Sequence, residues 1–190
     1  MKLMYLLGGL MLAGYLEVGA ADLTTGRLVA GMCQTCHGIN GFAPIPIAPH
    51  IGGEPQSYIK NQLMAYKNSE RDHEMMTIIA TSLSIQQIED VAAWYASHTA
   101  TARLPSEVSE ADAPSACISC HGVEGISLVE DAPNLAGEVN IYLATQLKAF
   151  RSGKRQHEIM TDIAAELSDD EIRDIANWYA NTLLKIERPQ

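Results

Sequence analysis

Apolar residues recur at helical spacing along most of the chain. In the segment 57–67, Tyr58, Leu63 and Tyr66 fall on one face of an expected helix. A shorter helix is expected over 24–32. No run alternates between apolar and polar residues clearly enough to predict a strand, so the pattern predicts an all-α fold.

Two further helices are predicted from a capping pattern that occurs at the first turn of each. Ser84 is followed three residues later by Gln87, and Ser168 is followed by Glu171. A serine with Gln or Glu at this distance forms a capping box, which marks the start of a helix. Apolar side chains then share one face of each helix. They are Ile88, Val91, Ala92 and Tyr95 in the first, and Ile172, Ile175, Ala176 and Tyr179 in the second.

These helices belong to an internal repeat with an offset of 84 residues. The offset aligns Tyr58 with Tyr142, and it aligns the sequence WYA of one terminal helix with WYA of the other. A repeat of this kind predicts two tandem domains of one fold. We place the domains at 22–100 and 115–190, joined by a polar linker over 101–114. The linker takes the place of the first domain's entry helix, so the second domain should begin with a shorter or irregular segment.

All four cysteines fall in two copies of one motif, C-x-x-C-H. The copies are Cys33, Cys36 and His37, and Cys117, Cys120 and His121. Two copies indicate two covalently bound haem c groups, because the thiols can bond to haem while the histidine ligates the iron. A redox dithiol and a zinc site are the alternatives. Zinc would need four ligands gathered from both halves, and nothing in the spacing indicates this.

Methionines matched by the repeat are candidates for the second axial ligand of each iron. Met160 is the only methionine after the second motif, and the offset places it on Met76. A thioether ligand raises the potential of a haem. Met75 is the neighbouring alternative in the first domain. His73 and His157, three residues before the methionines, could compete as ligands, although surface or propionate contacts suit them too. An ordinary core role is the other interpretation of the two methionines.

Two more matched pairs could support the haems. A histidine that ligates a metal normally donates its other ring N–H to a fixed acceptor, and the backbone carbonyls of Pro49 and Pro133 are candidates for this acceptor. Arg71 and Arg155 could pair with haem propionates, or they could simply be solvated in a polar loop.

The first 21 residues have the layout of a signal peptide. Lys2 precedes an apolar run, and small residues precede Asp22, with cleavage expected after Ala20 or Ala21. The apolar run is shorter than the roughly 20 residues that a spanning helix needs, which disfavours an uncleaved anchor. We therefore expect export to the periplasm, which agrees with attachment of c-type haem outside the bacterial cytoplasm.

The formal net charge of −10 argues against nucleic acid as a partner. It favours a redox protein partner with a basic docking surface, and it equally suits a surface that only keeps an exported protein soluble.

The motifs CQTCHG and CISCHG, each with its proline, methionine and WYA helix, resemble those of dihaem class I cytochromes c of the cytochrome c4 type. They are also similar to those of the dihaem cytochrome subunit of flavocytochrome c sulfide dehydrogenase. The short and equal intervals between histidine and methionine favour this second relative. The resemblance implies two tandem class I cytochrome c domains related by an approximate twofold axis, with haems close enough to exchange electrons.

If both irons carry histidine and methionine, no substrate reaches the metal, and the chain passes single electrons by outer-sphere transfer. It would then be no enzyme on its own, and the resemblance implies a sulfide-oxidising flavoprotein as partner and a cytochrome or oxidase as acceptor. The chain contains no G-x-G-x-x-G fingerprint, so a flavin would belong to a partner chain. The alternatives are a c4-type carrier to a terminal oxidase, and a dihaem peroxidase or thiosulfate dehydrogenase.

Overall fold

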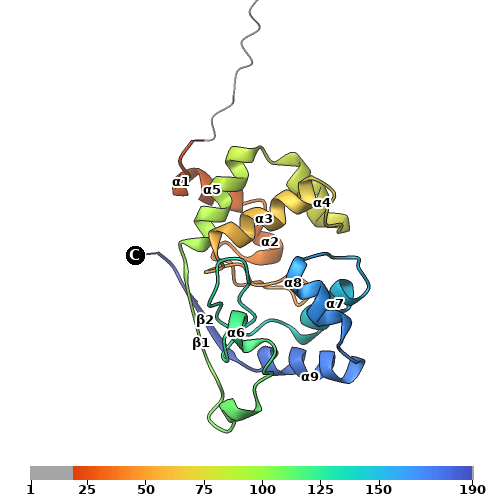
Figure 1. Cartoon of the computed structure of the whole chain (residues 1–190). Helices are drawn as coiled ribbons and strands as arrows, with labels where there is room; N and C mark the ends of the chain where they lie inside the picture. Colours follow the sequence, from red (N-terminus) through yellow and green to blue (C-terminus); the bar gives the residue numbers. More distant parts are fainter. Residues whose placement is uncertain (1–18, 190) are drawn as a thin grey trace, which may run out of the picture.

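The computed structural model describes residues 19–189, which form two helical bundles and a small ribbon (Figure 1). Residues 1–18, most of the predicted signal peptide, lie outside this range. The first bundle contains α1 (Leu23–Ala30), α2 (Gln34–His37), α3 (Gln56–Lys67), α4 (Glu74–Ser82) and α5 (Ile85–Ala96). Between residues 19 and 189, no helix combines the length and the apolar character needed to span a membrane.

The second bundle repeats the helices of the first except at its start. It contains the 3-10 turn η1 (Glu110–Asp112), followed by α6 (Ile118–His121), α7 (Asn140–Arg151), α8 (Glu158–Ala165) and α9 (Asp169–Ala180). Since η1 stands where the first bundle has α1, the expected irregular entry segment is confirmed. Both capping boxes are also confirmed, at Ser84 with Gln87 and at Ser168 with Glu171.

The core of the first bundle forms where α1 and α3 pack on α5. Ile88, Val91 and Tyr95 of α5 are almost completely buried there. The close approach of α1 depends on Gly26, because a Cβ atom at this position would lie 2.1 Å from the carbonyl oxygen of Asp90. The second bundle has no counterpart of α1, and a smaller buried cluster of Leu143, Ala176 and Tyr179 forms between α7 and α9.

The mostly helical structure confirms the all-α prediction, to which the structure adds an antiparallel ribbon of two strands. β1 (Thr99–Arg103) pairs with β2 (Leu183–Glu187), and Thr101 lies opposite Lys185. The sequence did not indicate these strands because each pairs with a segment far away in the sequence, and TATAR carries only a weak apolar alternation. Residues 101–103, which we assigned to the linker, therefore belong to a strand that the end of the chain holds in place.

Candidate functional site

Each C-x-x-C-H motif forms one helical turn that a glycine ends. Cys33 occupies the N-cap position of α2 without a side-chain hydrogen bond to the helix, and Cys117 occupies the same position before α6. Gly38, with φ 72°, turns the chain out of α2, and a Cβ atom there would lie 2.3 Å from the carbonyl oxygen of Phe42. Gly122 has the same φ after α6. A side chain at either glycine would therefore disturb the turn that brings two thiols and a histidine together.

The histidine of each motif is buried and held by a proline carbonyl. Nδ1 of His37 lies 2.9 Å from the carbonyl oxygen of Pro49, and Nδ1 of His121 lies 2.8 Å from that of Pro133. Because a carbonyl only accepts, Nδ1 carries the proton and Nε2 keeps its lone pair for a metal. Burial lowers the pKa of both histidines, which favours this neutral form. The predicted proline acceptors are thus confirmed.

The four thiols fit covalent attachment better than the two alternatives. All four cysteines are free and half-buried. Burial raises the pKa of Cys33 and of Cys117 to about 11, whereas a reactive dithiol needs a lowered pKa. Within residues 19–189, no three side chains of His, Cys, Asp or Glu converge as a zinc site requires. The donors in each bundle are therefore two thiols and one imidazole, which is the set that a c-type haem uses.

The methionines chosen from the repeat are less exposed than the residues that precede them on α4 and α8. Met76 is half-buried and packs against the first core, whereas 59% of Met75 is exposed. Met160 is half-buried as well, and Ile159, which corresponds to Met75, is 54% exposed. The packing favours Met76 over Met75.

His73 and His157 have a structural role at the starts of these helices. Nδ1 of His73 accepts hydrogen bonds from the backbone N–H groups of Met75 and Met76, and His157 caps α8 in the same way. Nε2 of His157 also lies 3.2 Å from Oδ2 of Asp131. Because helix capping occupies Nδ1, these histidines orient the methionine segments, and only Nε2 remains for any other contact.

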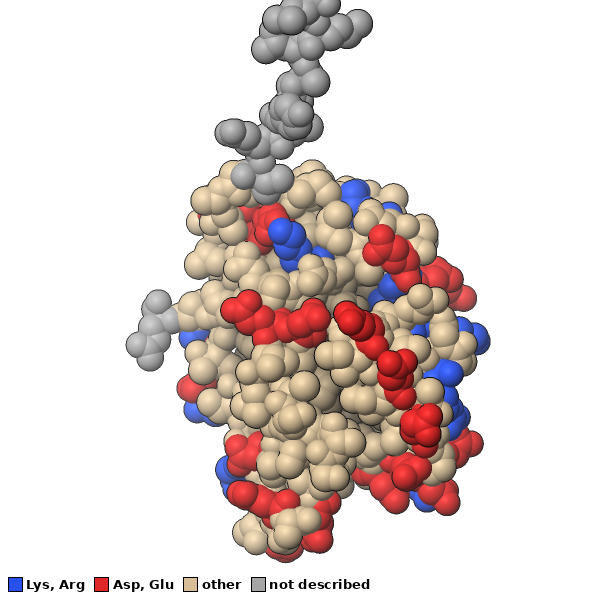
Figure 2. Space-filling view, viewed as in Figure 1, with Lys and Arg blue, Asp and Glu red and all other residues tan. Residues whose placement is uncertain are grey.

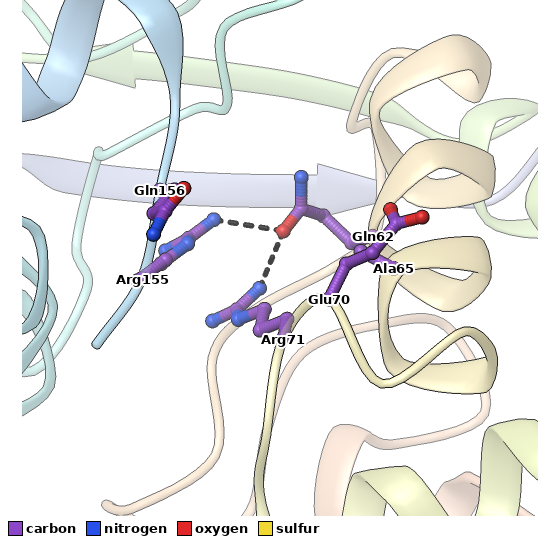
Figure 3. A pocket seen from close by; sticks show the side chains of 6 residues that line it. All are labelled: Gln62, Ala65, Glu70, Arg71, Arg155 and Gln156. Atoms are coloured by element: carbon purple, nitrogen blue, oxygen red, sulfur yellow. Dashed lines mark hydrogen bonds between the residues drawn. The ribbon is translucent and has the colours of Figure 1, made fainter. Parts of the chain in front are cut away.

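Arg71 and Arg155 do not lie in a solvated loop but in an interlocked cluster between the bundles. Both guanidinium groups donate to Oε1 of Gln62, at 2.6 and 2.9 Å (Figure 3). Both also donate to Oε1 of Gln146, at 2.8 and 2.9 Å. The cluster borders a pocket of about 460 Å³, also lined by Glu70. The sequence interpretation missed this cluster, although the offset of 84 residues relates the two arginines and the two glutamines to each other.

Both bundles thus present a pair of thiols on one turn, a histidine held by a proline carbonyl, and a half-buried methionine. Two such sets on helical bundles define a dihaem c-type cytochrome. Comparison with known proteins agrees with this assignment. Residues 111–182 match the Cytochrome c family model. Cytochrome c4 of Pseudomonas aeruginosa is 33% identical over 84% of this chain and 88% of its own length. The chain therefore belongs to the cytochrome c4 family, and it carries two covalently bound haem c groups.

Solved structures and a second curated relative add to this picture. Reduced cytochrome c4 from Pseudomonas stutzeri superposes with a TM-score of 0.74 and 26% identity, over 86% of this chain and 100% of that chain. Thiosulfate dehydrogenase from Marichromatium purpuratum gives a TM-score of 0.73 and 27% identity, over 85% of this chain but 40% of that chain. A thiosulfate dehydrogenase electron acceptor of Stutzerimonas stutzeri is 31% identical over 78% of both chains. The resemblance to c4-type cytochromes is confirmed.

Proposed function

We propose that each bundle binds one haem, with His37 and Met76 as axial ligands in the first bundle and His121 and Met160 in the second. The covalent bonds run through Cys33, Cys36, Cys117 and Cys120. The observation that carries this proposal is the recurrence, 84 residues apart, of a buried histidine on a proline carbonyl together with a half-buried methionine.

Such a site transfers electrons without binding a substrate at the metal. Covalently bound haem supplies one-electron oxidation and reduction. The proline carbonyl keeps the proton on Nδ1 and fixes the orientation of the imidazole, and the methionine would supply the second protein ligand of the iron. The chain is then a periplasmic dihaem carrier that exchanges single electrons by outer-sphere transfer.

The donor that the relatives favour is an enzyme that oxidises a sulfur compound. Two curated relatives are named thiosulfate dehydrogenase electron acceptors, and one structural neighbour is a thiosulfate dehydrogenase. A sulfide-oxidising flavoprotein is the second candidate donor and rests on the resemblance of the haem motifs alone. Asp and Glu side chains extend across the face of the molecule in Figure 2, which suits a partner with a basic surface.

The interface arginines are candidates to neutralise haem propionates. No carboxylate among the described residues forms an ion pair with Arg71 or Arg155, although the Arg155 side chain is buried. A buried guanidinium without a counter-charge is costly, and propionates would supply that charge from the cofactors.

The ligand assignment is tested by comparing Met76→Ala with the matched control Met75→Ala. Oxidised haem with a methionine ligand has a weak near-infrared band. Met76→Ala should remove half of this band and lower the potential of one haem, because the thioether is lost. Met75→Ala should leave the near-infrared band and both haem potentials unchanged. The assignment of the first site is wrong if the effects are exchanged, or if His73→Ala removes the band instead.

The donor is tested by mixing the oxidised holoprotein with thiosulfate or sulfide, each with and without the corresponding purified enzyme. Fast haem reduction by thiosulfate only in the presence of a thiosulfate dehydrogenase supports the favoured donor. Reduction by sulfide only with a flavoprotein supports the second candidate. Turnover of either compound by this chain alone would show an open iron and contradict the carrier proposal. Efficient reduction by a membrane cytochrome complex, and by neither enzyme, would assign the chain to a pathway that ends at a terminal oxidase.

A further inference from the structure

The peptide group that holds each motif histidine is itself held from its other side by a buried glutamate. The carbonyl of Pro49 and the N–H of His50 belong to one peptide group. Its oxygen lies 2.9 Å from Nδ1 of His37, and its N–H donates to Oε1 of Glu138 at 2.7 Å. Glu138, the peptide and His37 therefore form a continuous chain of hydrogen bonds.

The second bundle contains an equivalent series of hydrogen bonds, in which the glutamate comes from the first bundle. The oxygen of Pro133 lies 2.8 Å from Nδ1 of His121, and the N–H of Asn134 donates to Oε2 of Glu54 at 2.8 Å. Glu54 precedes α3 of the first bundle, and Glu138 precedes α7 of the second. Each glutamate thus reaches across the interface to the histidine of the opposite bundle.

Both carboxyl groups are buried deeply enough for their charge to matter. Glu54 is 4% exposed and Glu138 is 3% exposed, and neither forms an ion pair with a described basic side chain. Oε2 of Glu138 forms no hydrogen bond with good geometry among the described residues, although the backbone N–H of Val139 lies near this carboxyl. Burial of a carboxyl group without an opposite charge costs free energy, and packing alone could be supplied by an apolar residue.

The hydrogen-bond chain links the charge of the glutamate to the electron density of the histidine. A carboxylate that accepts from a peptide N–H polarises the peptide, and its carbonyl becomes a stronger acceptor. A stronger acceptor at Nδ1 makes the ligating imidazole more basic, which favours the oxidised iron.

We propose that Glu138 and Glu54 are positioning residues that act crosswise: ionised Glu138 lowers the potential of the haem ligated by His37, and ionised Glu54 lowers that of the haem ligated by His121. The proposal rests on the ligand assignment given above. It makes the domain interface part of each haem site, because neither bundle alone contains the carboxyl group that tunes its own haem.

The test uses the holoprotein, with Glu138→Gln as the variant and Glu124→Gln as the matched control. Glutamine keeps an oxygen that can accept from His50, but it removes the charge. Glu124 belongs to the same bundle and is exposed. Because burial raises the pKa of Glu138 to about 8, the comparison is made about one unit above this pKa, where most of the carboxyl is charged. Two quantities are measured for each haem, namely its reduction equilibrium and the proton resonance of Nδ1–H in the reduced, diamagnetic state.

In Glu138→Gln, the equilibrium constant for reduction of the haem ligated by His37 should rise roughly two- to fivefold, as expected when a charge-assisted hydrogen bond becomes a neutral one. The Nδ1–H resonance of His37 should move upfield, and that of His121 should stay. Glu54→Gln should leave the Nδ1–H resonance of His37 unchanged. It should move the Nδ1–H resonance of His121 once the pH is high enough to ionise Glu54 in the wild type. Glu124→Gln should move neither resonance.

Equal shifts of both haem potentials in Glu138→Gln, or an unchanged His37 resonance, would overturn the proposal. If Glu138→Gln does not fold, the wild type provides the same test, because ionisation of Glu138, followed through its carboxyl carbon, must move the His37 resonance. Glu54, Tyr142 and the backbone N–H groups of His50 and Val139 surround this carboxyl, so each is followed in the same titration. A failure of the methionine assignment would appear separately, as a near-infrared spectrum that does not respond to Met76→Ala.

Discussion

Replacement of Arg155 by methionine should weaken the contact between the two bundles. The guanidinium group donates to Gln146, Tyr58 and Gln62 at 2.9, 3.1 and 2.9 Å, and it stacks 4.5 Å from the ring centre of Phe150. Methionine has a similar length, and it removes the donors and the charge without leaving a large cavity. The change therefore removes the polar contacts of the cluster together with any contact between Arg155 and a haem propionate.

The size of the effect follows from those contacts. Hydrogen bonds that involve a charged group contribute about 1.5 to 3 kcal/mol each, and a cation–π contact contributes about 1 kcal/mol. Two effects reduce this sum: water from the adjoining pocket can replace some of the lost donors, and the variant no longer buries a charge. We expect the free energy of unfolding to fall by about 2 to 3 kcal/mol.

Urea unfolding of the oxidised holoprotein, followed by circular dichroism, measures this loss. Arg173→Met is the matched control, because Arg173 is 60% exposed and its ion pair with Asp170 should contribute less than about 0.5 kcal/mol. Loss of the contact should also separate the unfolding of the two bundles into two steps. A loss below about 1 kcal/mol, or one equal to that of Arg173→Met, would refute the view that the arginine cluster holds the bundles together.

Two further predictions concern stability. Burial raises the pKa of Glu138 from its ordinary value of 4.5 to about 8, so the folded state binds this proton more tightly than the unfolded state. The resulting stability should be complete below pH 4.5 and lost as the pH rises through about 8, and Glu138→Gln should flatten a plot of unfolding free energy against pH over this range. Gly26→Ala should cost more than about 2 kcal/mol, because its Cβ atom would displace α1 from α5. Gly153→Ala, with φ 73° but open space around it, should cost only about 1 kcal/mol when both variants are compared by urea unfolding, and equal losses would contradict this reasoning.

Features encoded by neighbouring residues could be predicted without the structure. The C-x-x-C-H turns, the capping boxes and the amphipathic helices depend on residues a few positions apart, so the sequence shows them directly. The internal repeat also allowed predictions about residues that lie farther apart. By aligning Met160 with Met76 rather than Met75, it selected the methionine that is half-buried in the structure, with Met75 exposed.

Features that depend on contacts between the bundles were decided only by the tertiary structure. The ribbon pairs residues 99–103 with 183–187, the arginine cluster joins Arg71 to Gln146, and Glu138 meets the peptide before His50. In each case the stabilising free energy comes from hydrogen bonds between groups far apart in the chain. No local sequence pattern indicates which distant group will be the partner. The repeat showed that Glu54 and Glu138 are equivalent residues, but only the folded interface showed that each serves the histidine of the other bundle.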